Sequence, residues 1–221
     1  MKTFEYFFDI LSPYSYLSWH WFRKNRLSLE EYGYQIKIIP VTLATIIGHY
    51  KTLGPAQIAP KRDYLFRDII RYARLHGIPF TTPKELPFNS LYGLRLSLAE
   101  VSGEHQMKVI DTLFEIGWGE GLDLGNIDVI QAEFKKKGLP VDQMIEKIGT
   151  REVREKLKMN VEYALSKGVF GLPSFIVDGE LFWGNDSLKY LEMFINDRDP
   201  LDKEKYREIL AKHNFSGLEL Q

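Results

Sequence analysis

The sequence predicts an α/β protein built on a four-stranded mixed sheet, with helices on both faces and a helical block inserted into the chain. Strand-like segments lie near both ends, at residues 3–9 and 34–41 and again at 173–184. A helical segment at 13–25 separates the first two strands and supplies the crossover that parallel strands need. The last segment is divided by an Asp-Gly pair, which is typical of an antiparallel hairpin.

The first strand and helix are predicted from local patterns. Aromatic residues occupy alternate positions of 3–9, which is the period of a strand with one buried face. Pro13 favours the start of a helix, because the N–H that proline lacks has no partner in a first helical turn. Ser12, directly before it, is a good N-cap residue. A strand, a sharp turn and a helix therefore follow one another at the start of the chain.

From about residue 45 the apolar residues recur with the period of helices. Leu65, Ile69 and Ala73 share one helical face, and four further amphipathic segments follow before residue 149. A stretch this long cannot be a loop in a compact protein. Residues 45–149 are therefore predicted to form an inserted helical domain.

The strands return after a long helix. Thr150 is a good N-cap for that helix, and Gly168 ends it. The Asp178-Gly179 hairpin follows, and then a last helix that opens at residues 184–186. The domain that carries the predicted sheet is thus discontinuous, 1–44 and 150–200. Residues 201–221 are predicted to hold a C-terminal helix at 202–213 and a frayed tail at 214–221.

Composition excludes several classes of function. The 221 residues are 44% hydrophobic, which is enough to bury a substantial core, and the net charge is −1. Nucleic-acid binding usually needs a basic excess, so we expect no nucleic-acid partner. No segment approaches the ~20 apolar residues of a membrane span. Residues 1–10 carry two carboxylates within their apolar run and make a poor signal peptide.

The chain contains no cysteine. A disulfide framework, a thiolate metal site and a redox-active thiol of the protein are therefore all excluded. Any sulfur chemistry would have to use a sulfur brought by a ligand. We expect a cytoplasmic location on this basis. No group of His, Asp and Glu has metal-ligand spacing, so we expect no metal.

Several motifs together resemble a known family. Ser12-Pro13-Tyr14-Ser15 occupies the strand-to-helix turn where DsbA-like thioredoxin folds place Cys-x-x-Cys, and GVFGLPSF resembles their cis-proline loop. With PFNSLYGLR and GELFWGND, these motifs are similar, in order, to the 2-hydroxychromene-2-carboxylate isomerases. That family is glutathione-dependent and allied to the kappa-class glutathione transferases. The resemblance runs to about residue 196 and implies a thioredoxin-like fold with a DsbA-like helical insertion.

The resemblance assigns Ser12 to the sulfur of glutathione. A helix N-terminus presents unpaired N–H groups and about half a positive charge, so it favours a thiolate. A serine hydroxyl there can donate to that sulfur but cannot be oxidised. The alternative is that Ser12 is only an N-cap, and the two roles are compatible.

The same resemblance implies residues for the rest of glutathione. The peptide groups of Leu172, before a cis Pro173, would pair with its extended cysteinyl backbone. Asn185 and Asp186 would hold the γ-glutamyl end, although both also suit a helix N-cap. Lys61 falls where the family has a lysine for the glycyl carboxylate, and its alternative is a solvated side chain.

One position departs from the family, and the second-substrate side is less defined. Leu53 stands near the place where the family has an asparagine. Tyr14 and Trp118 are candidates for the second-substrate pocket, and Trp118 could equally belong to an interhelical loop. Asn89 and Arg95 match a family motif. They are expected to brace the insertion against the strand-to-helix turn that carries Ser12, which we call the active turn.

The family implies a glutathione-dependent isomerase, and three hypotheses for the function remain. In the first, glutathione adds to and leaves an aromatic or chromene carboxylate, a small-molecule substrate. In the second, a kappa-like glutathione transferase or peroxidase uses the same site and releases a conjugate. In the third, the chain is a non-enzymatic binding module of thioredoxin fold. Relatives suggest a homodimer.

Overall fold

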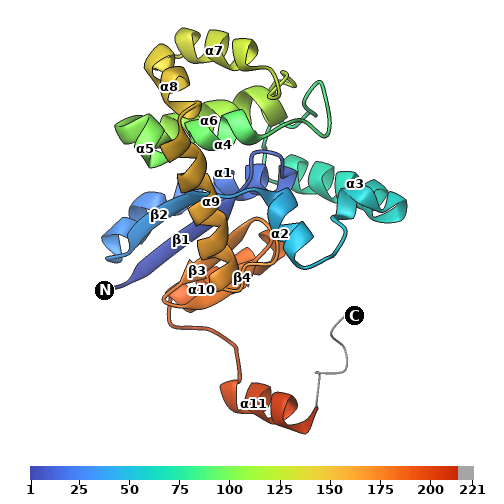
Figure 1. Ribbon diagram of the computed structural model, residues 1–221. Helices are drawn as coiled ribbons and strands as arrows, with labels where there is room; N and C mark the ends of the chain where they lie inside the picture. The colour runs from blue at the N-terminus through green and yellow to red at the C-terminus, as the bar shows by residue number, and fades with distance from the viewer. Residues whose placement is uncertain (214–221) are drawn as a thin grey trace. The chain divides into compact units, whose positions relative to one another are not determined.

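The computed structural model describes residues 1–213 and contains a four-stranded mixed sheet (Figure 1). The sheet has the spatial order β2-β1-β3-β4, with β1 (Thr3–Phe8), β2 (Gln35–Pro40), β3 (Ser174–Val177) and β4 (Glu180–Trp183). β1 pairs parallel with β2 and antiparallel with β3, and β4 pairs antiparallel with β3. The predicted fold class is therefore confirmed.

Helices fill the connections between the strands. In chain order they are α1 (Pro13–Glu31), α2 (Leu43–His49), η1 (Pro55–Gln57), α3 (Ala59–Leu75), α4 (Leu91–Leu96), α5 (Ala99–Ser102), η2 (Gly103–His105), α6 (Gln106–Phe114), η3 (Glu115–Gly119), α7 (Ile127–Lys136), α8 (Val141–Ile148), α9 (Arg151–Ser166), η4 (Asn185–Ser187), α10 (Leu188–Ile195) and α11 (Lys203–Lys212). The predicted tail at 214–221 lies outside the described residues.

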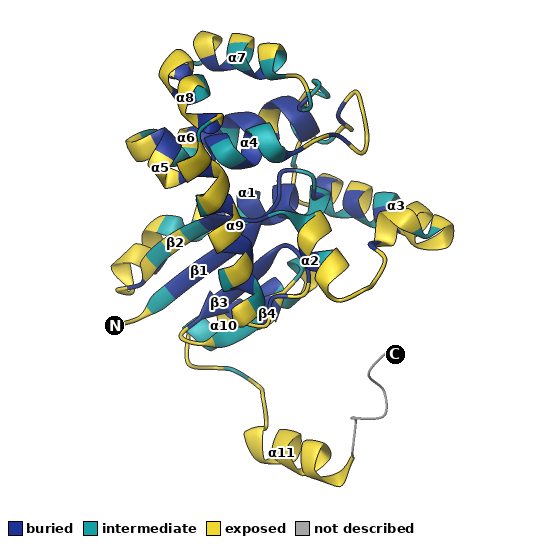
Figure 2. Ribbon diagram, in the orientation of Figure 1, coloured by how far each residue is buried: buried dark blue, intermediate teal, exposed yellow. Residues whose placement is uncertain are grey.

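β1 is the centre of the core, and its two faces meet different helices. On one face the Tyr6 ring lies 5.9 Å from Trp19 and 5.4 Å from Phe22, both on α1. On the other face Phe7 belongs to a buried cluster with Val161 of α9. Burial of one such side chain contributes about 1.5–3 kcal/mol. Figure 2 shows β1 and β3 buried, whereas α7 and α8 expose their outer sides.

The hairpin forms as the Asp-Gly pair predicts. Asp178 has φ 49° and Gly179 has φ 91°, which are the two left-handed positions of a type I′ turn. The first helix is longer than predicted, because it continues through residues 26–31 before Gly33 with φ 84°. A C-terminal helix is present, and Asp202 caps it by accepting the N–H of Lys205 at 2.9 Å.

The chain separates into two compact units. The first comprises Met1–Asp186 and holds the whole sheet and α1 to α9. The second begins at Ser187 and holds α10 and α11. Within the first unit, the finer division into a thioredoxin-like domain and an insertion at 45–149 stays a prediction.

A glycine often marks the end of a helix, but the helical segment that begins with α6 does not end at Gly117. α6 continues into a π-helical turn, η3, that carries Gly117. A Cβ on Gly117 would lie 2.2 Å from Cδ1 and 2.8 Å from Cγ of the buried Leu124. Glycine is therefore needed here for close packing and not as a helix stop.

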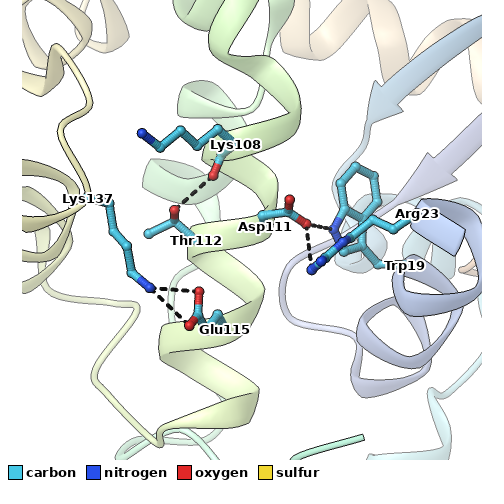
Figure 3. A network of polar contacts seen from close by, with 7 residues as sticks. All are labelled: Trp19, Arg23, Lys108, Asp111, Thr112, Glu115 and Lys137. Carbon is cyan, nitrogen blue, oxygen red and sulfur yellow. Dashed lines mark hydrogen bonds and ion pairs between the residues drawn. The ribbon is translucent and has the colours of Figure 1, made fainter. Parts of the chain in front are cut away.

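The first helix is tied to the insertion by a polar network on α6 (Figure 3). Asp111 accepts the Trp19 indole N–H at 2.6 Å and forms an ion pair with Arg23 at 3.1 Å. Four residues after Asp111, at the start of η3, Glu115 accepts the Lys137 ammonium at 3.0 Å. Burial raises the pKa of Asp111, and the bonds from Trp19 and Arg23 oppose that shift. Helix α1, which Ser12 caps, is thus held against α6 at Trp19 and Arg23.

A second tie holds the turn before that helix. The Asp9 side chain has no exposed surface, and its two oxygens accept the N–H groups of Leu11 at 2.9 Å and Leu43 at 2.8 Å. The Ser90 side chain also hydrogen-bonds to it. These partners belong to the active turn, the start of α2 and the segment before α4. One carboxylate therefore joins three segments that are distant in the sequence.

Gly117→Ala is expected to lower the free energy of unfolding by about 1–3 kcal/mol, because Leu124 must move to make room for the new methyl group. Gly48→Ala is the matched control. Gly48 is an exposed residue within α2 with nothing within 4 Å of an added Cβ, so its replacement should be neutral or stabilising. Equal effects of the two changes in urea unfolding would contradict the packing argument.

Asp9 should make the stability of the protein depend on pH. Burial is the largest cause of its shift and raises its pKa above the usual value, so the folded state keeps the proton to higher pH than the unfolded state. Stability from this group is full below the unfolded pKa and falls as pH rises through the folded pKa. Asp9→Asn removes the titration.

The free energy of unfolding of the wild type relative to Asp9→Asn should therefore decrease as pH rises from about 4. Urea unfolding of both proteins over a pH series measures this difference. A difference that grows with pH would show that the three hydrogen bonds outweigh burial and lower the pKa instead.

Candidate functional site

Ser12 caps α1 and faces the proline loop. Its Oγ accepts the N–H of Ser15 at 3.2 Å, so the expected N-cap is confirmed. The same hydroxyl donates to the carbonyl oxygen of Leu172 at 3.4 Å, a long hydrogen bond. Only 4% of Ser12 is exposed. The cap does not decide whether Ser12 also binds a sulfur, because one hydroxyl can accept and donate at once.

Two hydrogen bonds link the segment of Ser12 to the proline loop, and the proline loop to the end of β4. The Leu172–Pro173 peptide bond is cis, as the resemblance implies, and the unpredicted Leu86–Pro87 bond is cis as well. The N–H of Gly184 donates to the carbonyl of Pro173 at 3.0 Å. The active turn, the loop before β3 and the end of β4 therefore form one continuous surface that carries Ser12 and leads to Asn185.

The end of β4 requires glycine. Gly184 has φ 79°, and a Cβ there would lie 2.7 Å from Oδ1 of Asp186. The side chain of Asp186 thus folds back beside the strand end. Asn185 and Asp186 lie in the single turn η4 and not in a regular helix, so the predicted helix begins three residues later than its sequence suggests.

The N-terminus of α1 is electrostatically suited to an anion. The helix has 19 residues and no acidic side chain in its first turn. Its first N–H groups and its dipole therefore favour negative charge near Ser12. Such an environment lowers the pKa of a thiol placed there.

Some of the buried polar atoms that have no hydrogen-bond partner belong to the first turn of α1 and to the segment after β4. Within residues 1–213, four buried side-chain atoms have no hydrogen-bond partner: Oγ of Ser15, Nε of Arg95, and Nδ2 and Oδ1 of Asn185. Three of the four belong to Ser15, in the first turn of α1, and to Asn185, at the end of β4. An unpaired buried polar atom costs about 1–3 kcal/mol, so native proteins keep few of them. A polar ligand at this surface would give the Asn185 amide its missing partners.

α3 borders the active turn through Tyr14. The Tyr14 hydroxyl donates to Oδ2 of Asp68 at 2.9 Å. Burial, and then this hydrogen bond, raise the pKa of Tyr14, and Tyr64 and Asp186 lie close enough to raise it further. The phenol therefore stays protonated at neutral pH. Tyr14 and Asp68 therefore lie together beside the active turn, and Tyr64 and Asp186 lie near Tyr14.

The remaining candidate for glutathione, Lys61, and the departure from the family at Leu53 lie on either side of η1 in the chain. Lys61 is exposed in the first turn of α3. Leu53, where the family has an asparagine, is 61% exposed between α2 and η1. The role of Lys61 stays a prediction, and an exposed leucine offers no hydrogen bond in place of the asparagine.

Trp118 does not line an open pocket. Its side chain is fully buried and stacks on Phe80 at a centroid distance of 6.1 Å. Its indole N–H donates to the carbonyl of Ile10 at 2.8 Å. Trp118 is therefore a link between the insertion and the active turn, and we remove it from the candidate substrate pocket.

Other expected contacts are also different. Asn89 accepts the N–H of Leu91 at 3.1 Å, and Arg95 donates to the carbonyl of Ile148 at 3.5 Å, both inside the insertion. The bracing expected of them is made instead by Ser90 and Trp118. His20 packs edge-on against Tyr16, and burial lowers its pKa.

Sequence reasoning missed Asp9, Ser90 and Asp68 as residues that shape the site. Asp9 carried a signal, because a carboxylate within an apolar run needs buried donors. Ser90 and Asp68 carried none. Within residues 1–213 no group of three His, Asp or Glu side chains could hold a metal ion, and no helix there is long and apolar enough to span a membrane.

Several known proteins are similar to this chain. Residues 3–196 match the family model of the DSBA-like thioredoxin domain. A 2-hydroxychromene-2-carboxylate isomerase of Pseudomonas putida is 30% identical over 195 residues, covering 85% of this chain and 91% of the relative. Human glutathione S-transferase kappa 1 is 28% identical over 215 residues, covering 89% and 92%.

A solved structure agrees with these sequence relationships. A 2-hydroxychromene-2-carboxylate isomerase superposes with a TM-score of 0.78 at 26% identity, over 88% of this chain and 95% of that one. The chain therefore belongs to the DsbA-like thioredoxin proteins and, among them, to the family of the 2-hydroxychromene-2-carboxylate isomerases.

Proposed function

We propose that the protein is a glutathione-dependent isomerase of the 2-hydroxychromene-2-carboxylate type. The observation that carries the proposal is the joint location of Ser12, at an anion-favouring helix N-terminus, and Asn185, whose buried amide has no partner. The names of the relatives support it, since one group is isomerases and the other is glutathione transferases. The absence of cysteine leaves a ligand as the source of any reactive sulfur.

When bound, glutathione supplies a thiolate that adds reversibly to an activated double bond and so allows rotation about it. The protein would stabilise the thiolate with the Ser12 hydroxyl and the N–H groups of α1. The existing bond from Ser12 to the Leu172 carbonyl is long at 3.4 Å, so the hydroxyl can turn toward a sulfur at small cost. Holding both reactants together would supply much of the rate enhancement.

The rest of glutathione would bind along the surface that leads from Ser12 to Asn185. The peptide groups of Leu172 would pair with its cysteinyl backbone. Asn185 would bind the γ-glutamyl carboxylate through its amide N–H groups, and Asp186 would bind the ammonium. Lys61 is proposed for the glycyl carboxylate.

A second candidate is a kappa-like glutathione transferase or peroxidase, which the 28% identity to the human kappa enzyme favours. The two activities share a site and differ in product, because an isomerase regenerates glutathione and a transferase consumes it. Product analysis at limiting glutathione separates them. If calorimetry at millimolar glutathione gives no heat, a non-enzymatic binding module would replace both.

A homodimer and a cytoplasmic location complete the proposal. Sedimentation measures the first, and cell fractionation measures the second.

Ser12→Ala should lower kcat for 2-hydroxychromene-2-carboxylate by about 100-fold or more, which is the usual effect of removing one donor to a developing or bound anion. Loss of the N-cap should also cost about 1 kcal/mol of stability, so activity is compared well below the melting temperature. Ser28→Ala, at an exposed position of the same helix, is the control. Normal turnover by Ser12→Ala would remove Ser12 from the mechanism.

Asn185→Ala should weaken glutathione binding by about 10- to 150-fold, which corresponds to the loss of one hydrogen bond to a charged group. It should not lower the melting temperature, because no hydrogen bond within the protein is lost. Calorimetric titration and thermal unfolding measure the two effects. Unchanged glutathione affinity would mean that the amide faces something other than this ligand.

A further inference from the structure

The active turn has a second neighbour besides the proline loop, and this is one face of α3. Asp68 defines that face, because its carboxylate accepts the Tyr14 hydroxyl at 2.9 Å. Tyr64 lies four residues before Asp68, and Arg71 lies three residues after it. Residues at these spacings are neighbours on a helix surface. Tyr64, Asp68 and Arg71 therefore form a stripe along the side of α3 that adjoins Tyr14.

We propose that this stripe is the wall that binds the second substrate, a planar aromatic carboxylate. In this arrangement the rings of Tyr14 and Tyr64 contact the aromatic part, and Arg71 binds the carboxylate. The inference rests on the proposed function, to which it adds the residues that bind the second substrate. These residues replace the buried Trp118 as candidates for that role.

Asp68 acts in this site as a positioning residue. A tyrosine at the mouth of the turn could rotate its ring away, which would cost binding free energy when a ligand fixes it again. The hydrogen bond to Asp68 holds the phenol from the far end and leaves the apolar part of the ring to face the ligand. Tyr14 is only partly buried, so that ring remains accessible.

Tyr64 supplies the second aromatic surface. Its side chain is 62% exposed, although burial of one aromatic side chain is worth a few kcal/mol. It lies near enough to Tyr14 to affect the pKa of that phenol. Tyr14 of α1 and Tyr64 of α3 thus lie near each other, an arrangement suited to stacking on a flat ligand.

Arg71 differs from two other arginines of α3, Arg62 and Arg67, in having no partner among the residues that the structure describes. Arg67 is paired with Asp63 at 3.0 Å, and Arg62 donates to the carbonyl of Ala56 at 3.2 Å. Within residues 1–213, Arg71 forms no ion pair, even with the neighbouring Asp68, which binds Tyr14. A free guanidinium next to an aromatic surface is well matched to a carboxylate, which it can bind through two parallel hydrogen bonds.

The test measures direct binding with two matched probes, naphthalene-2-carboxylate and the neutral naphthalene-2-carboxamide. Titration calorimetry is run with the full chain, with and without glutathione. Tyr64→Ala should weaken binding of both probes by about tenfold, and Arg71→Gln should weaken only the carboxylate, also by about tenfold. Arg62→Gln, an exposed arginine nine residues before Arg71 and therefore on the opposite side of the same helix, should change neither.

Asp68 is tested by a pair of variants. Asp68→Ala should weaken both probes, and Asp68→Asn should restore binding, because an amide oxygen still accepts the Tyr14 hydroxyl. A merely structural role of Asp68 would lower the melting temperature without this difference in affinity. Tyr64 and Arg71 are exposed, so their variants should fold normally, which circular dichroism checks.

Failure of this inference is distinguishable from failure of the proposed function. If the wild type binds glutathione but the Tyr64 and Arg71 variants bind the carboxylate as the wild type does, the wall is wrong and the proposed function stands. If the wild type binds no aromatic carboxylate, the wall is also wrong. If the variants lose the carboxylate but glutathione never binds, the wall stands and the proposed function fails.

Discussion

The buried carboxylate of Asp9 is the interaction on which the geometry of the site depends. Burial of a charged group is unfavourable unless donors surround it, and here two main-chain N–H groups and a serine side chain do so. The donors come from the active turn, from the start of α2 and from the segment before α4. Because one group satisfies all three, a shift of any segment leaves a buried charge or a buried N–H without its partner. The position of the turn that carries Ser12 is therefore fixed by the hydrogen bonds of Asp9.

The insertion fixes the same turn from the side. The Trp118 indole holds the carbonyl of Ile10, the Tyr16 hydroxyl donates to the carbonyl of Pro79, and Asp111 holds Trp19. Each bond joins the first helix or its turn to the inserted segment. The helical block thus does more than cover the sheet, since it prevents the helix N-terminus from moving. Electrostatic stabilisation of an anion requires donors that are already oriented before the ligand arrives.

Local signals in the sequence predicted most of the fold. Alternation in β1, the Asp178-Gly179 turn and the Ser12 cap each depend on residues close together in the chain, and all three are present. Contacts between distant segments left no comparable trace, so Asp68 and Ser90 were missed and Trp118 was assigned to a pocket. The close packing at Gly117 left no local trace either, because the side chain that excludes a Cβ there is seven residues away in the loop after η3. The unpaired amide of Asn185 is a property of the folded surroundings alone.

Replacement of the Cys-x-x-Cys cysteines by serines changes the chemistry of the turn without changing its electrostatics. The helix dipole and free N–H groups still favour an anion, but the hydrogen bonds of the Ser12 hydroxyl within residues 1–213 go to main-chain groups and not to a general base, so the hydroxyl is a weak nucleophile. Such a site can stabilise a reactive anion and cannot itself supply one. Meanwhile the unpaired atoms of Ser15 and Asn185 each lower the stability of the protein by about 1–3 kcal/mol. A site that attracts an anion, lacks its own nucleophile and holds polar atoms in reserve is best explained by a ligand that brings both the sulfur and the missing hydrogen-bond partners.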